Sequence, residues 1–147
     1  MKFKKIATIA MAGIMTASFL TGCGSNTEST NNGSDKVTVA MVSDVAGIND
    51  QSYNQSAWEG LERAKKELGI EIKYLESQQD SDYATNVETL ADEEVDLIIG
   101  VGSKLADTIK DAAENYPDQK FAIIDETYDE IPSNVTPIVF KANEAAY

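Results

Sequence analysis

The sequence contains no histidine and a single cysteine, Cys23, among its 147 residues. Without histidine, the commonest general base of enzymes is missing, and a zinc site built from cysteine and histidine cannot be assembled. One cysteine also leaves no second thiol in the chain with which a disulfide could form. The composition therefore predicts a protein that binds rather than catalyses, with no metal and no cofactor.

Basic residues are scarce: 12 lysines and arginines stand against 25 aspartates and glutamates, a net charge of −13. Lys2, Lys4 and Lys5 lie at the extreme N-terminus, and without them nine basic residues remain and the net charge is −16. A surface of this charge repels nucleic acid and anionic lipid. No nucleic-acid partner is expected.

The first 22 residues have the pattern of a secretory signal peptide. Three lysines precede an uncharged apolar run, Ile6–Leu20, which is followed by small residues rather than by a basic cluster. The run is shorter than the roughly 20 residues needed to span a bilayer. Residues 1–22 are therefore predicted to be a cleaved leader.

The end of this segment and the residue after it, Leu20-Thr21-Gly22-Cys23, resemble the bacterial lipobox, in which the cysteine is acylated and becomes the first mature residue. Acyl chains add roughly 0.8 kcal/mol of membrane affinity per buried CH₂, so an acylated Cys23 would hold the protein at a membrane. Residues 23–35 lack apolar side chains able to pack. This composition predicts a flexible tether with a mean span of about 20 Å. The expected location is the extracytoplasmic side of the cell membrane.

The segment 36–147 has the size of one domain, and short apolar runs alternate in it with helical patterns. This alternation predicts an α/β fold with a doubly wound, mostly parallel sheet, helices on both faces, strand order 2-1-3-4 and a fifth strand beyond. The expected strands are 37–42, 70–75, 96–101 and 120–125; the expected helices are 52–68, 82–93 and 103–116.

Residues 135–140 predict the fifth strand, and Pro137 places it at an edge because proline cannot donate to a central ladder. The connection 126–134 is short for a parallel crossover, so the direction of this strand stays open. A further helix begins at Ala142, and the sequence ends five residues later, so the chain is expected to be a truncated form.

Helix boundaries carry their own signals. Ser52 followed by Gln55 resembles a capping box, Gly69 suits the C-terminal end of the first helix, and Pro117 ends the third.

Two aspartates follow apolar strands directly. In open parallel sheets ligands bind beyond the carboxyl ends of the strands, where Asp44 and Asp125 are placed. A carboxylate there is costly unless it accepts hydrogen bonds, either from a ligand rich in O–H and N–H groups or from the following turn. Both alternatives remain open on position alone.

Three further polar or aromatic side chains are candidates at the same edge. Tyr53 could offer a flat face to a planar base or sugar, or could close the core against the first helix. Asn54 has a donor and an acceptor for a ligand or a loop. Ser103, after Gly100-Val101-Gly102, could cap the third helix or touch a ligand, and the two glycines could let backbone N–H groups approach it.

The run Val42–Leu61, which includes Asp44, Tyr53, Asn54 and Trp58, resembles the signature of the basic membrane protein family of lipoproteins, to which purine nucleoside receptors belong. Further matching segments follow in register: Gly100–Ser103, Tyr116–Asp118, Phe121–Asp125, Phe140 and Asn143–Ala145.

The resemblance implies a type I periplasmic-binding-protein-like lobe, one of two that close on a solute and deliver it to the permease and ATPase subunits of an ABC importer. It implies that Tyr53 stacks on a nucleoside base and that Asp44 and Asp125 bond base and ribose, with Asn54 and Ser103 as further contacts. Phenylalanine is the more usual aromatic at the position of Tyr53. Family chains are about twice as long, so the second lobe is missing and weak binding or none is expected.

Three alternatives remain from the sequence. The same fold could serve a membrane-tethered ligand sensor or regulator, because a fold does not fix where a signal is sent. The chain could be a truncated fragment that binds nothing. A hydrolase would need Asp44 and Asp125 to act as a carboxylate pair.

Overall fold

The computed structural model describes residues 36–145, so the predicted leader, tether and lipid-bearing Cys23 lie outside the described residues. Among residues 36–145, no helix combines the length and the apolar character needed to cross a bilayer. The elements follow in the order β1 (Thr38–Ser43), α1 (Tyr53–Leu68), β2 (Glu71–Glu76), α2 (Asp82–Asp92), β3 (Leu97–Val101), the 3₁₀ turn η1 (Ser103–Leu105), α3 (Ala106–Asn115), β4 (Phe121–Ile124), β5 (Val135–Ile138) and α4 (Ala142–Ala145).

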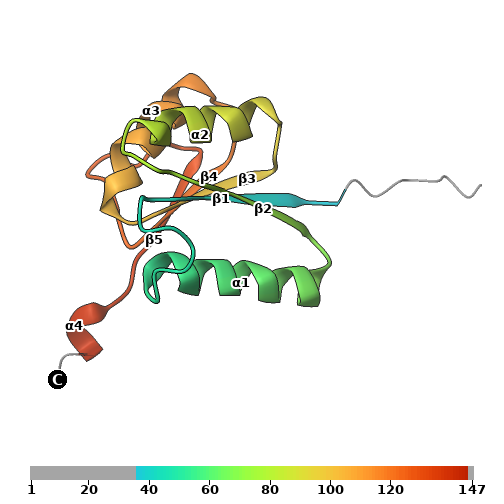
Figure 1. The fold of residues 1–147 in the computed structure, drawn as a ribbon. Helices are drawn as coiled ribbons and strands as arrows, with labels where there is room; N and C mark the ends of the chain where they lie inside the picture. The colour runs from blue at the N-terminus through green and yellow to red at the C-terminus, as the bar shows by residue number, and fades with distance from the viewer. Residues whose placement is uncertain (1–35, 146–147) are drawn as a thin grey trace, which may run out of the picture. The chain divides into compact units, whose positions relative to one another are not determined.

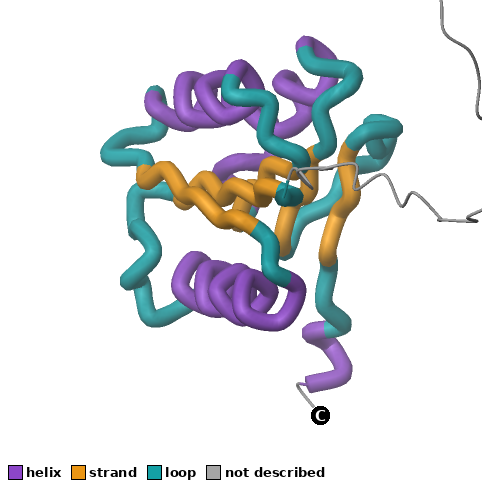
Figure 2. The backbone as a smooth tube through the Cα atoms, turned by 90° about the vertical axis from the view of Figure 1, so that its right-hand side faces the viewer, coloured by secondary structure: helices purple, strands orange, loops and turns teal. Residues whose placement is uncertain are grey.

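The strands form one sheet in the order β2-β1-β3-β4-β5, and every neighbouring pair is parallel. Helix α1 covers one face, and α2 and α3 cover the other (Figure 1). The same three layers are visible when the sheet is viewed from the side (Figure 2). The predicted fold class and strand order are confirmed.

Alternate residues of the strands feed two cores. Ala40, Val42 and Ile98 pack with the apolar sides of α2 and α3, whereas Met41 and Ile99 pack with α1. Because both faces of the inner strands β1, β3 and β4 are covered, their sequences are almost continuously apolar, whereas the edge strand β2 carries charged residues. The Val- and Ile-rich runs seen in the sequence are explained by this double burial.

The direction of the fifth strand is now established. β5 is parallel to β4, with Thr136 opposite Ala122 and Pro137 opposite Ile123. Pro137 lies in an edge strand, as predicted. A loop without a helix makes the crossover, and the Tyr128 hydroxyl fastens it by donating to the carbonyl of Ala106 at 2.8 Å. A short crossover is possible because the loop packs on α3 and needs no helix of its own.

The predicted capping box at the start of α1 is wrong. Ser52 makes no side-chain cap bond. The carboxylate of Asp50 takes this role: it accepts the backbone N–H groups of Ser52 (2.8 Å), Asn54 (3.0 Å) and Gln55 (3.0 Å). Gln55 instead accepts from the backbone N–H of Gln51 at 3.2 Å. An aspartate two residues earlier satisfies more orphan donors than a serine hydroxyl could.

The other two helix boundaries are closer to expectation. Gly69 has φ 71° and donates its N–H to the carbonyl of Lys65, as a left-handed C-terminal residue should. The third helical segment begins as the 3₁₀ turn η1 at Ser103 and continues as α3 to Asn115, two residues before Pro117.

Candidate functional site

The carboxyl ends of β1, β3 and β4 meet at one edge of the sheet, and the loops that follow them carry the predicted site residues. We call this region the carboxyl edge. It includes Asp44 after β1, Ser103 after β3, Asp125 after β4, and the start of α1 with Tyr53 and Asn54.

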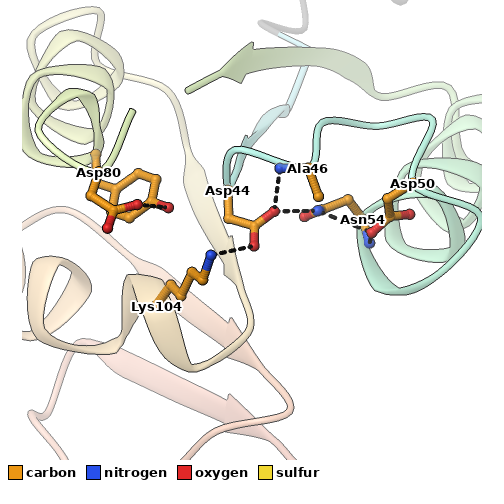
Figure 3. A network of polar contacts seen from close by, with 7 residues as sticks. Asp44, Ala46, Asp50, Asn54, Asp80 and Lys104 are labelled. Atoms are coloured by element: carbon orange, nitrogen blue, oxygen red, sulfur yellow. Dashed lines mark hydrogen bonds and ion pairs between the residues drawn. The ribbon is translucent and has the colours of Figure 1, made fainter. Parts of the chain in front are cut away.

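Asp44 is half-buried, and its two carboxylate oxygens have different surroundings. Oδ1 accepts the backbone N–H of Ala46 at 3.0 Å and the side-chain amide of Asn54 at 2.8 Å. Oδ2 lies 3.9 Å from Nζ of Lys104, across the edge (Figure 3). Oδ1 therefore serves the turn that follows β1, as one of the two alternatives expected, while no hydrogen bond within residues 36–145 occupies Oδ2.

Asn54 is 3% exposed and holds two carboxylates together. Its Nδ2 donates to Asp44 and, at 3.1 Å, to Oδ2 of Asp50 (Figure 3). Its Oδ1 is buried and has no partner within the described part of the chain. The side chain thus fixes Asp44 against the start of α1, and a direct contact of Asn54 with a ligand stays a prediction.

Asp50 is a residue that the sequence reasoning missed. Burial opposes its ionisation, but the backbone N–H groups of Gln55, Ser52 and Asn54, together with the Asn54 amide, outweigh burial and lower the pKa of Asp50 below its ordinary value. Asp50 is therefore a stable anion that orients Asn54. The signal that could have found it is an aspartate two residues before a helical pattern.

Tyr53 opens α1 with 57% of its surface exposed. Its ring lines a hollow of about 420 Å³ together with Ser52, Ser56, Ala57, Ile124 and Phe140. This hollow lies between the start of α1 and the ends of β4 and β5. Among residues 36–145, no hydrogen bond joins Tyr53 to Asp44, so the aromatic face and the Asp44 network are neighbouring parts of the edge and not one bonded cluster.

The two glycines at the end of β3, Gly100 within the strand and Gly102 just after it, serve the fold. A Cβ on Gly100 would lie 2.8 Å from Cγ1 of Ile109, so glycine lets α3 approach the strand. Gly102 has φ 82° and ψ 168°, a conformation nearly restricted to glycine, and its N–H donates to the carbonyl of Ile124 at 2.9 Å. That N–H is used by the sheet and is not free for a ligand. Ser103 follows it and is exposed at the start of η1.

Asp125 is exposed directly after β4 and has φ 62°, in the left-handed region. Its backbone N–H donates to the carbonyl of Ile138 at 2.8 Å, so β5 fixes its backbone. No side-chain hydrogen bond or ion pair within residues 36–145 occupies its carboxylate. An aspartate tolerates this conformation better than most residues, and the carboxylate is left open to solvent.

Two more residues of the edge, Asp80 and Tyr83, were not predicted. The Tyr83 hydroxyl donates to Oδ1 of Asp80 at 2.8 Å. Figure 3 shows Asp80 to the left of Asp44 and above Lys104. Burial of the ring, the hydrogen bond to Asp80, and the charges of Asp80 and Asp44 raise the pKa of Tyr83 to about 12. Tyr83 therefore remains a neutral donor between two carboxylates. Within residues 36–145, no group of three histidine, cysteine or acidic side chains is arranged to hold a metal ion.

A larger hollow, of about 970 Å³, lies away from the carboxyl edge along the outer strand β2. Its walls include Trp58 and Tyr74, whose rings meet edge to face with centroids 4.8 Å apart. No predicted site residue lines it. Volume alone therefore does not mark the place where the candidate side chains converge.

Comparison with known proteins gives consistent matches. Residues 37–147 match the model of the family Bmp, described as "ABC transporter substrate-binding protein PnrA-like". A protein of Pyrococcus abyssi named "Uncharacterized lipoprotein" is 41% identical over 140 residues, covering 94% of this chain and 34% of its own length. The "ABC transporter nucleoside-binding protein BmpA" of Lactococcus lactis subsp. cremoris is 35% identical over 150 residues, covering 98% of this chain and 42% of its own length.

A solved structure of ABC transporter system solute-binding proteins from Aeropyrum pernix K1 is similar with a TM-score of 0.69 and 32% identity. The match covers 75% of this chain and 30% of that one. The chain thus spans less than half the length of these two relatives and of this solved structure.

Proposed function

The chain belongs to the Bmp family of PnrA-like ABC transporter substrate-binding proteins, and from this premise we propose that its carboxyl edge is one half of a binding site for a small polar solute, a nucleoside. The solute is received outside the cell and delivered to the permease and ATPase subunits of an importer. Members of the family are substrate-binding proteins rather than a class of enzymes, so no bond is made or broken here.

The observation that carries the proposal is the arrangement of Asp44. Asn54 and Ala46 hold one carboxylate oxygen in place, and no hydrogen bond within residues 36–145 occupies the other. A fixed acceptor that needs no rearrangement is suited to a ribose hydroxyl or a base N–H, because the side chain loses little conformational freedom on binding. Asp125, on the next strand but one from β1, supplies a second unoccupied carboxylate.

Tyr53 adds the flat surface that a planar base requires. Its ring is more than half exposed and stands over the hollow formed with Ile124 and Phe140. Stacking on an aromatic face contributes about 1–3 kcal/mol per base in proteins that bind single-stranded nucleic acids, and the same contact is available to a single nucleoside. Ser103 and Asn54 are proposed as further polar contacts.

Attachment to the membrane is proposed through acylation of Cys23, with residues 23–35 as the tether. The Pyrococcus abyssi relative is named a lipoprotein, which supports this part of the proposal. The domain then faces the extracytoplasmic side of the cell membrane, close to its transporter partners.

The first test is a nucleoside titration of the 147-residue chain followed by NMR. Because one lobe offers contacts on a single side of the solute, we expect dissociation constants in the millimolar range, roughly 1–10 mM. Adenosine, inosine and uridine should shift the amide signals of Ala46, Tyr53 and Asp125. Ribose alone should cause smaller changes, because it cannot stack on Tyr53.

Matched variants separate the site from the rest of the acidic surface. Asp125→Ala should weaken nucleoside binding at least threefold, since it removes an unoccupied acceptor. Asp118→Ala removes the same charge from the turn before β4, at the opposite edge of the sheet, and should leave binding unchanged. If no nucleoside shifts any of the three signals at 20 mM, or if both variants respond alike, the assignment of this solute to this edge is wrong.

A further inference from the structure

Lys104 is the basic side chain placed against the carboxylates of the carboxyl edge. Its Nζ lies 3.9 Å from Oδ2 of Asp44, with the lysine side chain 54% exposed and the aspartate 21% exposed. Figure 3 shows the lysine side chain directed toward Asp44. This cation is unusual in a chain with more than twice as many acidic as basic residues.

The backbone holds Lys104 in this position. It is the middle residue of η1, which begins after Gly102, and the neighbouring Leu105 is fully buried. The N–H of Leu105 donates to the carbonyl of Gly102 at 3.2 Å, and Gly102 is itself bonded to the end of β4. With Leu105 anchored in the core, the adjacent side chain is directed outward over the edge.

The ammonium group reaches the one oxygen of Asp44 that is not already bonded. Oδ1 accepts from Ala46 and Asn54, so only Oδ2 remains for an incoming group. Without Lys104, an edge carrying Asp44, Asp80 and Asp125 would attract cations, because like charges gathered at one place raise the local concentration of counter-ions. With Lys104 present, a positively charged solute meets a site whose best acceptor already has a counter-ion.

We propose that Lys104 determines the charge specificity of the site: its ammonium group occupies the cation position beside Asp44, so that the edge accepts uncharged hydrogen-bond donors and rejects amines. This inference takes its ligand class from the proposed function and adds the residue that restricts it. A neutral hydroxyl or amide donates to Oδ2 with the lysine still in place, whereas a cationic group must displace it.

The first experiment needs no nucleoside. Putrescine, a small diamine, is titrated into the full chain at about 20 mM salt, and the signals of the Ala46 amide and the Asn54 side-chain amide are followed by NMR. Two unit charges about 4 Å apart in a water-exposed setting interact enough to change an equilibrium about fivefold. Lys104→Gln should therefore lower about fivefold the midpoint, the putrescine concentration at which these two signals have shifted halfway. Lys104→Arg should leave that concentration as in the unaltered chain.

Lys66→Gln is the matched control. It removes the same charge from an exposed position near the C-terminal end of α1, at the opposite edge of the sheet, and should change the midpoint by less than twofold. Adding Asp44→Asn to Lys104→Gln should abolish the gain, because the uncovered carboxylate is then gone. Equal midpoints for Lys104→Gln and the unaltered chain, or equal effects of Lys104→Gln and Lys66→Gln, overturn the inference.

A second experiment compares adenosine with 5′-amino-5′-deoxyadenosine, which carries a positive charge at neutral pH. The unaltered chain should prefer adenosine, and Lys104→Gln should shift the ratio of the two affinities about fivefold toward the amine, with less effect at 0.5 M salt. If neither nucleoside binds while putrescine behaves as described, the proposed function fails and the role of Lys104 stands. If both nucleosides bind and Lys104→Gln does not change the ratio of their affinities, the proposed function stands and the inference fails.

Discussion

Gly100, in β3, and Gly60, in α1, differ in the space around their Cα atoms. A Cβ on Gly100 would lie 2.8 Å from Cγ1 and 3.1 Å from Cδ1 of Ile109, and 3.2 Å from Cδ1 of Ile123. All three atoms belong to buried side chains of the core beneath α3. Gly60, on the exposed side of α1, has no atom within 4 Å of that position. The first glycine is required by packing, and the second is not.

Gly100→Ala should lower the free energy of unfolding by about 1–3 kcal/mol, because the added methyl group overpacks a core that has no room for it. Gly60→Ala should raise it by about 0.5–1 kcal/mol, because alanine has the higher helix propensity and meets nothing. Urea unfolding followed by circular dichroism measures both changes. Equal effects of the two substitutions would show that α3 does not approach β3 as closely as described.

The site residues show which functional features can be inferred from single positions. Asp44 and Asp125 were identifiable because a carboxylate directly after an apolar strand is conspicuous in any sequence. Asp50 and Lys104 were missed because their importance lies in what they contact: Asp50 binds three backbone N–H groups, and Lys104 faces Asp44 across 60 residues of chain. A contact between loops distant in sequence has no local signature.

At the level of elements, Asn134 is a second side chain, besides Tyr128, that fastens the connection from β4 to β5. Nδ2 of Asn134 lies within hydrogen-bond distance of three carbonyl oxygens, those of Ala113 (3.0 Å), Tyr116 (3.1 Å) and Gln119 (3.0 Å), which share its two hydrogens. These carbonyls lie at the end of α3 and in the turn before β4, where helix geometry leaves acceptors without partners. Asn134 therefore joins the start of β5 to the end of α3.

Asn134→Ala should lower the free energy of unfolding by about 1–3 kcal/mol, because partly buried acceptors lose their donor. Faster amide hydrogen exchange is expected first in β5, because β5 is an edge strand and pairs with β4 alone. Asn115→Ala, at the exposed last residue of α3, is the control and should change stability by less than 0.5 kcal/mol. Similar losses for both variants would show that Asn134 does not hold the two elements together.

The elements themselves were largely predictable from the sequence, for a physical reason. Strands buried on both faces must be apolar throughout, and helices between them must show a 3.6-residue period, so the alternation is written into the chain. The direction of β5 was not predictable, because the loop after Asp125 lacks a helical pattern and its route depends on Tyr128 packing against α3. The residue that caps the start of α1 was not predictable either. Several polar residues precede the helix, and only the folded loop shows that the Asp50 carboxylate accepts its N–H groups.

For the whole molecule, the N-terminal sequence predicts that the domain is held at the membrane by lipid and not by protein. Leu20-Thr21-Gly22-Cys23 offers a single acylation site, and the net charge of −16 after removal of the leader gives the domain itself no attraction to anionic lipid. Cys23→Ser should therefore release the protein from the membrane fraction into the soluble extracytoplasmic fraction, or leave the uncleaved precursor in the membrane with its leader attached. Ser25→Ala, two residues away, should change neither the location of the protein nor the removal of its leader.

Fractionation of cells, with the N-terminal mass determined by mass spectrometry, distinguishes these states. The unaltered protein should carry an acylated cysteine as its first residue, because the prediction assigns its affinity for the bilayer to covalent acyl chains. A protein that remains in the membrane fraction after Cys23→Ser with its leader removed would mean that another part of the molecule contacts the membrane.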